Sequence, residues 1–419
     1  MTIAESNKLA CTGREQRVAI VHDWLPLVGG AEKVLEQILA VYPEADVFTL
    51  FDFVSRTDAP FLTGRKVTTS ILQKLPKAKH YYRYLLPVLP LAIEQFDLSN
   101  YELVISSSSA VAKGVITSPD QTHVCYCHSP MRYAWDMQSQ YLQQAGLEFG
   151  IKSAYLRYVL HKIRMWDATS STRVDAFIAS SEHVRGRIRK SYRRDSTVIN
   201  PPVGTQRFEL QEAKEDFYLA ASRQVSYKRI DLIIEAFNQC PDKQLVVIGD
   251  GPEHKKLKAL AGPNVHMLGY QADDVMVDYM RRAKAFVFAA YEDFGIIPLE
   301  AQACGTPVIA YKRGGARETV INNETGVLFD EQTTFSLLQA IQHFEQMQHT
   351  FSPSMIRDLT IPYSDAHFRE RLKLFIDNEI HLHRESLSER QTPNANCTDP
   401  LSYASNGTGK QRYEEASLN

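Results

Sequence analysis

Short apolar runs alternate with helical stripes along most of the chain. In the first half, residues 17–22 (RVAIVH) predict a buried strand, Gly29 and Gly30 predict a turn, and residues 31–41 predict a helix with one apolar face. Four further strands are predicted in this half, at residues 47–51, 103–106, 123–127 and 176–180. Strands that alternate with helices predict a parallel sheet with right-handed crossovers.

A second series of the same kind follows an interruption at residues 198–203 (VINPPV). Pro201 and Pro202 cannot continue a helix or a central strand, so this segment is expected to connect two domains. The predicted strands lie at residues 217–221, 244–248, 265–268, 285–289 and 307–310, and the predicted helices at residues 229–239, 255–261, 274–282 and 298–304. Two α/β domains also suit a chain of 419 residues, which is longer than one hydrophobic core usually supports.

The domain boundaries are predicted from these breaks. Residues 17–200 form the first domain and residues 201–362 the second, while residues 363–383 form an amphipathic helix that is expected to pack back on the first domain. Residues 1–16 and 384–419 are poor in apolar side chains, and we expect a flexible N-terminus and a disordered tail there.

Composition narrows the class of protein. A formal net charge of -2 and a pI near 6.7 leave no basic field for nucleic acid. The N-terminus lacks the apolar core of a signal peptide, and no window reaches the roughly 18 apolar residues of a membrane span, so we expect a cytoplasmic protein, soluble or peripheral on the inner face of the plasma membrane. Of six scattered cysteines only Cys125 and Cys127 lie close together, which favours reduced structural thiols over a metal site.

The segment EDFGIIPLE, from Glu292 to Glu300, is the sharpest candidate site, and it follows a predicted strand. Pro298 suits the first position of a helix, and Gly295 allows a close approach of the backbone to a ligand. Free N–H groups at the start of that helix would attract an anion. Carboxylates would repel a phosphate, so Glu292 and Glu300 suit sugar hydroxyls; an acid favoured by the helix dipole is the alternative interpretation of Glu300.

Two cations follow the first strand of the second half. Arg223 ends that strand and Lys228 lies in the next loop, at the strand ends where parallel sheets bind ligands. An arginine fork with a lysine charge suits a leaving diphosphate, and a solvated surface pair is the alternative. Gly249, in the turn GDGP, ends the next strand on the same rim.

Together these motifs resemble the nucleotide-sugar domain of glycosyltransferase family four. They follow the order of that family within residues 216–329, as ASR at 221–223, KR at 228–229, GDGP at 249–252, EDFGIIPLE at 292–300 and CGTPVIA at 304–310. The resemblance implies the GT-B fold, an α/β architecture in which two Rossmann-like domains with parallel sheets face a central cleft. It also implies a retaining transferase that uses a nucleotide diphosphate sugar as donor and needs neither a metal nor a cofactor.

The resemblance assigns roles to these residues. Arg223 and Lys228 would hold the donor diphosphate and take part in catalysis, Glu300 would bind the ribose, and Glu292 would bind the hydroxyls of the transferred sugar. Backbone contacts to the donor are expected from Gly249, Gly295, Ile296 and Ile297.

The first half resembles the family more distantly. Gly29 and Gly30 match its glycine loop near the donor phosphate, and an ordinary tight turn is the alternative. His128, at the end of a predicted strand, stands where the family places a catalytic histidine that contacts the transferred sugar; a packed or surface histidine is the alternative.

The segments VHDWL and GAEKVLEQIL are similar to mannosyltransferases of bacterial O-antigen and polysaccharide synthesis. This similarity implies GDP-mannose as donor and a lipid-linked or oligosaccharide acceptor. Residues 74–91 and 152–166 mix basic, aromatic and apolar side chains, which favours an anionic membrane surface as a partner; core-facing helices with a solvated basic face are the alternative.

Other classes of protein remain open. A GT-B sugar phosphorylase or a nucleotide-sugar epimerase would share the fold. A non-catalytic dinucleotide-binding protein would require the spacing G-x-G-x-x-G after the first strand, which Gly29, Gly30 and Ala31 do not supply.

Overall fold

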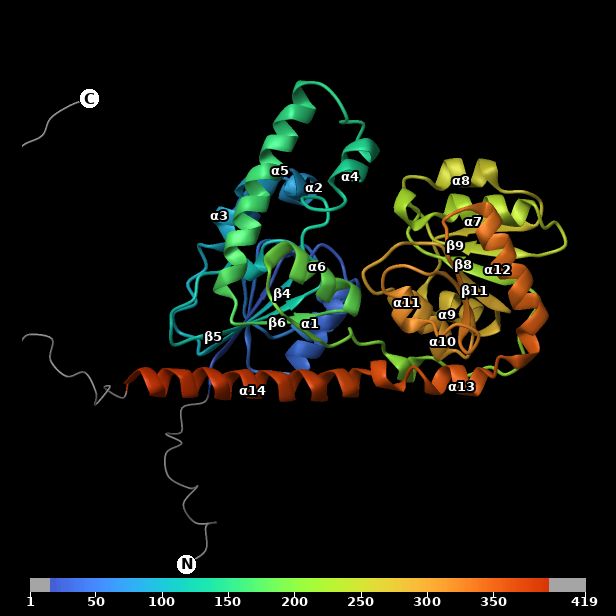
Figure 1. Ribbon diagram of the computed structural model, residues 1–419. Helices are drawn as coiled ribbons and strands as arrows, with labels where there is room; N and C mark the ends of the chain where they lie inside the picture. The colour runs from blue at the N-terminus through green and yellow to red at the C-terminus, as the bar shows by residue number, and fades with distance from the viewer. Residues whose placement is uncertain (1–15, 392–419) are drawn as a thin grey trace, which may run out of the picture.

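A computed structural model describes residues 16–391, and the predictions for residues 1–15 and 392–419, with Cys11 and Cys397, lie outside the described residues. Two α/β domains stand side by side, and a long helix at the C-terminal end of the described chain runs beneath the first of them (Figure 1). Each domain is built on one sheet of parallel strands.

The first domain contains a seven-stranded parallel sheet in the order β3-β2-β1-β4-β5-β6-β7. Its strands are β1 (Val18–His22), β2 (Asp46–Thr49), β3 (Val67–Thr69), β4 (Leu103–Ser108), β5 (Thr122–Cys127), β6 (Ala176–Ala179) and β7 (Thr197–Val198). Its helices are α1 (Gly30–Val41), α2 (Ala78–Tyr81), α3 (Leu89–Ile93), α4 (Gln138–Gln144), α5 (Ile151–Ser170) and α6 (Glu182–Tyr192). Strands β1, β4 and β5 are entirely buried, as expected for the central strands of a parallel sheet covered on both faces.

The second domain contains a six-stranded parallel sheet in the order β10-β9-β8-β11-β12-β13. Its strands are β8 (Tyr218–Ala221), β9 (Leu245–Ile248), β10 (Val265–Gly269), β11 (Ala285–Phe288), β12 (Val308–Tyr311) and β13 (Gly326–Phe329). Its helices are α7 (Ile230–Asn238), α8 (His254–Leu260), α9 (Asp273–Arg282), α10 (Ile296–Ala303), α11 (Ala316–Thr319), α12 (Thr334–Met347) and α13 (Pro353–Asp358). In both sheets the strand order reverses beside the first strand of the domain, which is the place where open α/β sheets bind ligands.

Helix α14 (Asp365–Gln391) returns the chain to the first domain (Figure 1). Its apolar stripe, which includes Leu372 and Ile376, is buried in the same core cluster as Leu35 and Ile38 of α1. The helix is longer than predicted, because residues 384–391, expected in the disordered tail, are its last turns. That stretch is polar but contains no glycine or proline, so nothing in it breaks the helix.

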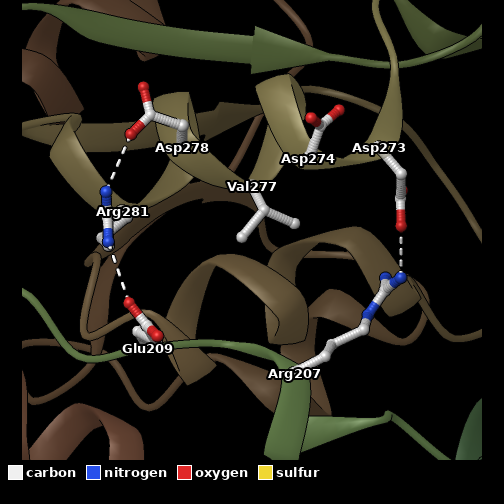
Figure 2. Close-up of a pocket in the computed structure, with 7 residues that line it drawn as sticks. All are labelled: Arg207, Glu209, Asp273, Asp274, Val277, Asp278 and Arg281. Carbon is white, nitrogen blue, oxygen red and sulfur yellow. Dashed lines mark hydrogen bonds and ion pairs between the residues drawn. The ribbon is translucent and has the colours of Figure 1, made fainter.

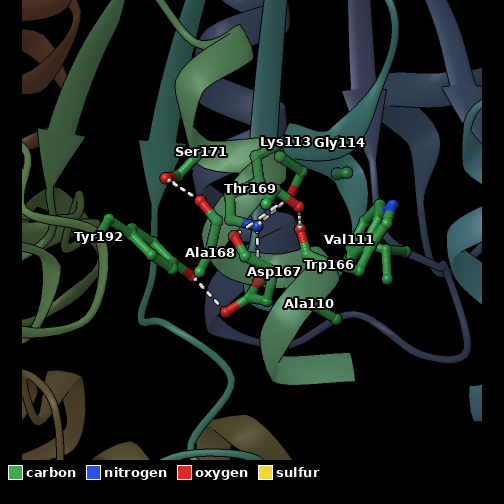
Figure 3. A network of polar contacts seen from close by, with 12 residues as sticks. Ala110, Val111, Lys113, Gly114, Trp166, Asp167, Ala168, Thr169, Ser171 and Tyr192 are labelled. Carbon is green, nitrogen blue, oxygen red and sulfur yellow. Dashed lines mark hydrogen bonds and ion pairs between the residues drawn. The ribbon is translucent and has the colours of Figure 1, made fainter. Parts of the chain in front are cut away.

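A buried ion pair fixes α5 against the first sheet (Figure 3). The side chains of Lys113 and Asp167 are 1% and 0% exposed, and Lys113 Nζ lies 2.5 Å from Asp167 Oδ1. The other carboxylate oxygen accepts hydrogen bonds from Trp135 Nε1 (2.7 Å) and from the hydroxyl of Tyr192 (2.9 Å). Because removing one partner of a buried pair leaves an uncompensated charge, at a cost of about 3–5 kcal/mol, this network sets the position of α5 firmly.

The two basic and aromatic segments differ in structure. Residues 152–166 lie within the continuous helix α5, whereas residues 74–91 do not form one amphipathic helix. Lys77 adopts a left-handed conformation (φ 57°) just before α2, and the 3₁₀ turns that follow, at Tyr82–Val88, contain Pro87. Along residues 16–391, no helix has both the length and the apolar character needed to cross a membrane.

Cys125 and Cys127 are buried free thiols on β5. Burial raises the pKa of Cys127 well above its ordinary value, and a protonated thiol is a poor metal ligand. Within the described part of the chain, no group of three or more His, Cys, Asp or Glu side chains is arranged to hold a metal ion.

Candidate functional site

A cavity of about 350 Å³ lies between the two domains, at the carboxyl ends of their strands. The first domain supplies Gly30, Ala31, His128, Arg132 and Ser180, and the segment joining the domains supplies Pro201. The second domain supplies Tyr227, Lys228, Glu292, Asp293, Phe294, Gly295, Ile296 and Ile297. The structure therefore brings together predicted residues from both halves of the sequence, including His128, Lys228, Glu292 and Gly295.

The start of helix α10 faces this cavity. Gly295 precedes the helix with φ 88°, a left-handed conformation that favours glycine, and no side chain caps the helix there. Gly295, Ile296 and Ile297 line the cavity, so the first turn of the helix, whose N–H groups have no intrahelical partner, begins at its wall. The helix begins two residues earlier than predicted, which places Pro298 at its third position rather than its first.

Lys228 and Glu292 contact each other across the cavity wall. Lys228 ends a 3₁₀ turn after β8, and its ammonium group forms an ion pair with the Glu292 carboxylate. Burial and, to a smaller extent, the nearby charge of Arg132 together lower the pKa of Lys228 to about 8. An anionic ligand in the cavity would add a second negative charge beside this ammonium group, which already pairs with Glu292.

Arg223 and Gly249 lie outside the residues that line the cavity. Arg223 is exposed in the loop after β8. Gly249 has φ 127°, and a Cβ atom added there would lie 1.9 Å from the carbonyl oxygen of Ser222. The GDGP turn is therefore packed tightly against the loop that carries Arg223, which is a structural use of the glycine.

Glu300 lies deep in the interface between the domains. It belongs to the second turn of α10 rather than the first, and its side chain is 4% exposed. Its Oε1 atom lies 3.0 Å from Nζ of Lys33, on α1 of the first domain, and 2.7 Å from Nη2 of Arg207. The carboxylate predicted to bind ribose is therefore held by two cations in this structure.

The glycine loop and α10 approach each other closely. Gly30 is the first residue of α1, and a Cβ atom added there would lie 2.9 Å from Cδ1 of Ile296. The N–H of Gly29 donates a hydrogen bond to Oε2 of Glu32 at 2.9 Å. A side chain at position 30 would therefore require the end of the Ile296 side chain to shift at the rim of the cavity.

His128 follows β5 and lines the cavity from the first domain. Burial is the main cause that lowers the pKa of His128 to about 3, with a smaller contribution from His22. The imidazole is therefore neutral near pH 7.

Three further charged residues at the site were not identified from the sequence. The carboxylate of Asp293 forms ion pairs with Nη1 of Arg132 at 3.4 Å and with Nη1 of Arg187 at 3.3 Å, both from the first domain. Arg132 also places its guanidinium 5.9 Å from the ring centre of Tyr227. The contacts join elements far apart in sequence, so no local pattern could have indicated them.

A second set of contacts closes the domains around α6. The carboxylate of Glu318 accepts hydrogen bonds at 2.8 Å from the backbone N–H groups of Glu182 and His183, the first two residues of that helix. Ser181 caps the same helix and donates its hydroxyl to the backbone carbonyl of Asp293 at 2.6 Å. The loop with Glu292 and Asp293 is thereby tied to the first domain.

A hollow of about 360 Å³ beside α9 in the second domain has a different character (Figure 2). Four carboxylates line it, from Glu209, Asp273, Asp274 and Asp278. Its two arginines, Arg207 and Arg281, are ion-paired to these acids. This surface is unsuited to a diphosphate.

Two α/β domains, each with a parallel sheet, face each other across a cavity, which is the arrangement of the GT-B class of glycosyltransferase folds. Residues 203–356 match the family described as Glycosyl transferases group 1. The match confirms the resemblance to glycosyltransferase family four over most of the second domain. The predicted GT-B fold is confirmed by the two parallel sheets and by solved structures that match both domains.

Individual relatives support the same class. An uncharacterized glycosyltransferase of Methanocaldococcus jannaschii is 27% identical over 177 residues, which are 41% of this chain and 50% of that protein. A GDP-mannose-dependent monoacylated alpha-(1-6)-phosphatidylinositol monomannoside mannosyltransferase of Corynebacterium glutamicum is 40% identical over 114 residues, which are 24% of this chain and 30% of that protein. The chain thus spans half or less of the length of these relatives.

A solved structure extends the similarity over both domains. The structure of HepE from Anabaena, in complex with UDP-glucose, has a TM-score of 0.64 with this chain at 18% identity, covering 86% of this chain and 99% of that one. At this identity the similarity establishes the fold.

Proposed function

We propose that this protein is a retaining, metal-independent glycosyltransferase that transfers a hexose from a nucleoside diphosphate sugar, with mannose from GDP-mannose as the preferred pair. One observation carries the proposal: the cavity between the domains joins the open start of α10, the Lys228 ammonium and the neutral His128 imidazole. The start of α10 and the Lys228 ammonium suit a diphosphate, and the His128 imidazole suits a sugar hydroxyl.

The donor diphosphate would lie against the N–H groups of Gly295 and Ile296 and the ammonium of Lys228. Arg223, at the carboxyl end of the adjacent β8, would reach the diphosphate from the rim. The transferred sugar would face His128 and Glu292, and the ribose would bind Glu300 after displacing a cation from it.

In the proposed reaction the acceptor hydroxyl forms a bond to the anomeric carbon on the face from which the diphosphate departs. The bond from that carbon to the phosphate oxygen breaks, its electron pair stays with the oxygen, and this oxygen takes the hydroxyl proton. Lys228 and the helix start stabilise the negative charge that develops. The cavity carboxylates, Glu292 and Asp293, are each ion-paired, which favours this route over a carboxylate nucleophile.

The proposed sugar and acceptor rest on other observations than the reaction class does. The Corynebacterium relative is by name a GDP-mannose-dependent mannosyltransferase, and the HepE structure holds UDP-glucose. A lipid-linked or polysaccharide acceptor is proposed because basic and aromatic side chains of α5 suit an anionic membrane surface.

The test is release of nucleoside diphosphate from GDP-mannose, UDP-glucose, UDP-galactose and UDP-N-acetylglucosamine, with and without EDTA. We expect slow hydrolysis of GDP-mannose that bacterial lipid extract accelerates and that EDTA leaves intact. Turnover of a UDP-sugar alone would replace the proposed donor, and loss of turnover with EDTA, restored by Mg²⁺ or Mn²⁺, would contradict metal independence. No turnover of any of the four would leave a non-catalytic nucleotide-binding protein as the better interpretation.

A further inference from the structure

A chain of polar side chains leads from His128 into the first domain. Ser107 Oγ lies 2.8 Å from Nε2 of His128 and 3.1 Å from Nδ1 of His22. Nε2 of His22 then lies 3.6 Å from Oε1 of Glu32, whose other oxygen accepts the N–H of Gly29. The chain crosses the carboxyl ends of three neighbouring strands, β1, β4 and β5, and ends at the glycine loop.

The carboxylate of Glu32 at one end of the chain favours one direction for its hydrogen bonds. An imidazole with one proton places that proton on the nitrogen nearer the carboxylate, which is Nε2 of His22, and its Nδ1 atom is then an acceptor. Ser107 must then donate its hydroxyl proton to His22, and its oxygen accepts the proton on Nε2 of His128. Nδ1 of His128 is left with a free lone pair, and among the described residues it has no hydrogen-bond partner.

We propose that Ser107 and His22 are positioning residues that hold His128 in the Nε2–H tautomer, so that its Nδ1 atom accepts a hydrogen bond from a hydroxyl of the transferred sugar. The proposal rests on the function proposed above. Burial of these side chains supports a fixed arrangement, because Ser107 is fully buried and His22 nearly so. The low pKa of His128 supports a neutral ring with one proton.

The energetic reason for such a relay is the geometry of a neutral imidazole. It has one donor and one acceptor, and an untethered ring could present either of them to the sugar. A ring with Nδ1–H toward the cavity would require a hydroxyl lone pair instead of a hydroxyl proton. If the tautomer is fixed before the sugar binds, no free energy is spent on selecting it in the complex.

The chain offers a matched control on the same strand. Ser106 Oγ lies 2.8 Å from Nε2 of His123, in a second buried serine–histidine pair. This pair does not line the cavity. Ser106→Ala removes the same kind of bond from β4 without touching His128.

The primary experiment is nitrogen NMR of the full-length protein with labelled histidine at pH 8, assigned with His128→Gln. We expect the Nε2–H tautomer for His128 in the unmodified protein and a mixture of tautomers in Ser107→Ala. Ser107→Thr, which keeps the hydroxyl group, should restore the single tautomer. An Nδ1–H tautomer in the unmodified protein, or a tautomer that Ser107→Ala leaves unchanged, would overturn the proposal.

Kinetics provide the second readout. Ser107→Ala should lower kcat by about tenfold with the donor KM within twofold, whereas Ser106→Ala should leave both constants within twofold of normal. Equal losses in the two variants would show that only the stability of the strand matters. Because the tautomer is measured without substrate, absence of transferase activity would refute the proposed function while the spectrum still decides the inference.

Discussion

The two glutamates of the EDFGIIPLE segment occupy different environments. Glu292 contacts Lys228 at the cavity, beside the place proposed for the transferred sugar. Glu300 lies buried between Lys33 and Arg207, away from the bond that would break. A difference in position of this kind predicts a difference in kinetics.

Replacing each glutamate by glutamine should separate the two roles. A ribose contact is made equally in the ground and transition states, so Glu300→Gln should raise the donor KM by about tenfold and largely spare kcat. Glu292→Gln should lower mainly kcat, because charge develops on the sugar ring as the diphosphate departs. Initial rates against donor concentration, after circular dichroism confirms folding, decide between the roles; the reversed pattern would exchange them, and no change in either would show that the segment is structural.

Cavity residues could be predicted from the sequence only where they belong to a recognisable motif. Lys228, Gly295 and His128 stand at strand ends or helix starts, and the ends of parallel strands must meet at one edge of a sheet. Arg187 pairs with Asp293 only because α6 meets the second domain, and a single sequence holds no record of that approach. Arg132 lies four residues after His128 in the sequence, but no local pattern indicates that it pairs with Asp293.

At the scale of elements, strong periodicity gave reliable predictions. Strand β5 begins one residue before the predicted strand 123–127, and α9 begins one residue before the predicted helix 274–282; both end where predicted. Helix α6 was not predicted, because its eleven residues bury only Val184, Ile188 and Tyr192 and are otherwise mostly charged or polar. Helix α12 was also not predicted, although its buried residues Leu337, Ile341 and Phe344 carry a helical spacing that could have indicated it.

The start of α5 exposes an apolar surface with basic neighbours. Phe149, just before the helix, and Ile151, its first residue, are each 91% exposed. Lys152 follows directly, and the exposed side chains of Tyr155 and Tyr158 come later on the same helix. Such a surface suits insertion into the headgroup region of an anionic membrane.

We therefore expect the protein to bind vesicles that contain phosphatidylglycerol and to be released as salt increases, at about 1 kcal/mol per basic residue near the surface. Phe149→Ser combined with Ile151→Ser should weaken binding in a sedimentation assay, while Tyr270→Ser, an exposed aromatic change on the second domain, should not. No binding at low salt would contradict the membrane proposal and favour a helix with a solvated basic face.

At the scale of the whole molecule, α14 and the Glu318 contacts hold the two domains together. Helix α14 packs on α1, while α13 just before it packs on α10 of the second domain. Glu318 satisfies two N–H groups at the start of α6 that would otherwise lack an intrahelical partner. These contacts bring the loop with Glu292 against the first domain.

Removing the Glu318 carboxylate should therefore open the cleft. Hydrogen bonds to a charged group contribute about 1.5–3 kcal/mol each, so Glu318→Ala should increase the radius of gyration in small-angle X-ray scattering and lower kcat/KM at least tenfold. Glu324→Ala, an exposed change in the same domain, is the control. An unchanged radius and unchanged kcat/KM in Glu318→Ala would show that the closed arrangement does not depend on this contact.

The central claim is that the diphosphate of a sugar donor is stabilised by Lys228 in the cavity between the domains. The most direct test is the rate of nucleoside diphosphate release by Lys228→Ala, with whichever of the four nucleotide sugars the unmodified protein turns over. The control is Lys256→Ala, which alters an exposed lysine of α8 in the same domain. Loss of about 2.7–4 kcal/mol of transition-state stabilisation predicts a rate lower by about 100-fold or more for Lys228→Ala and a normal rate for Lys256→Ala. A folded Lys228→Ala protein that releases nucleoside diphosphate within twofold of the normal rate would contradict the account.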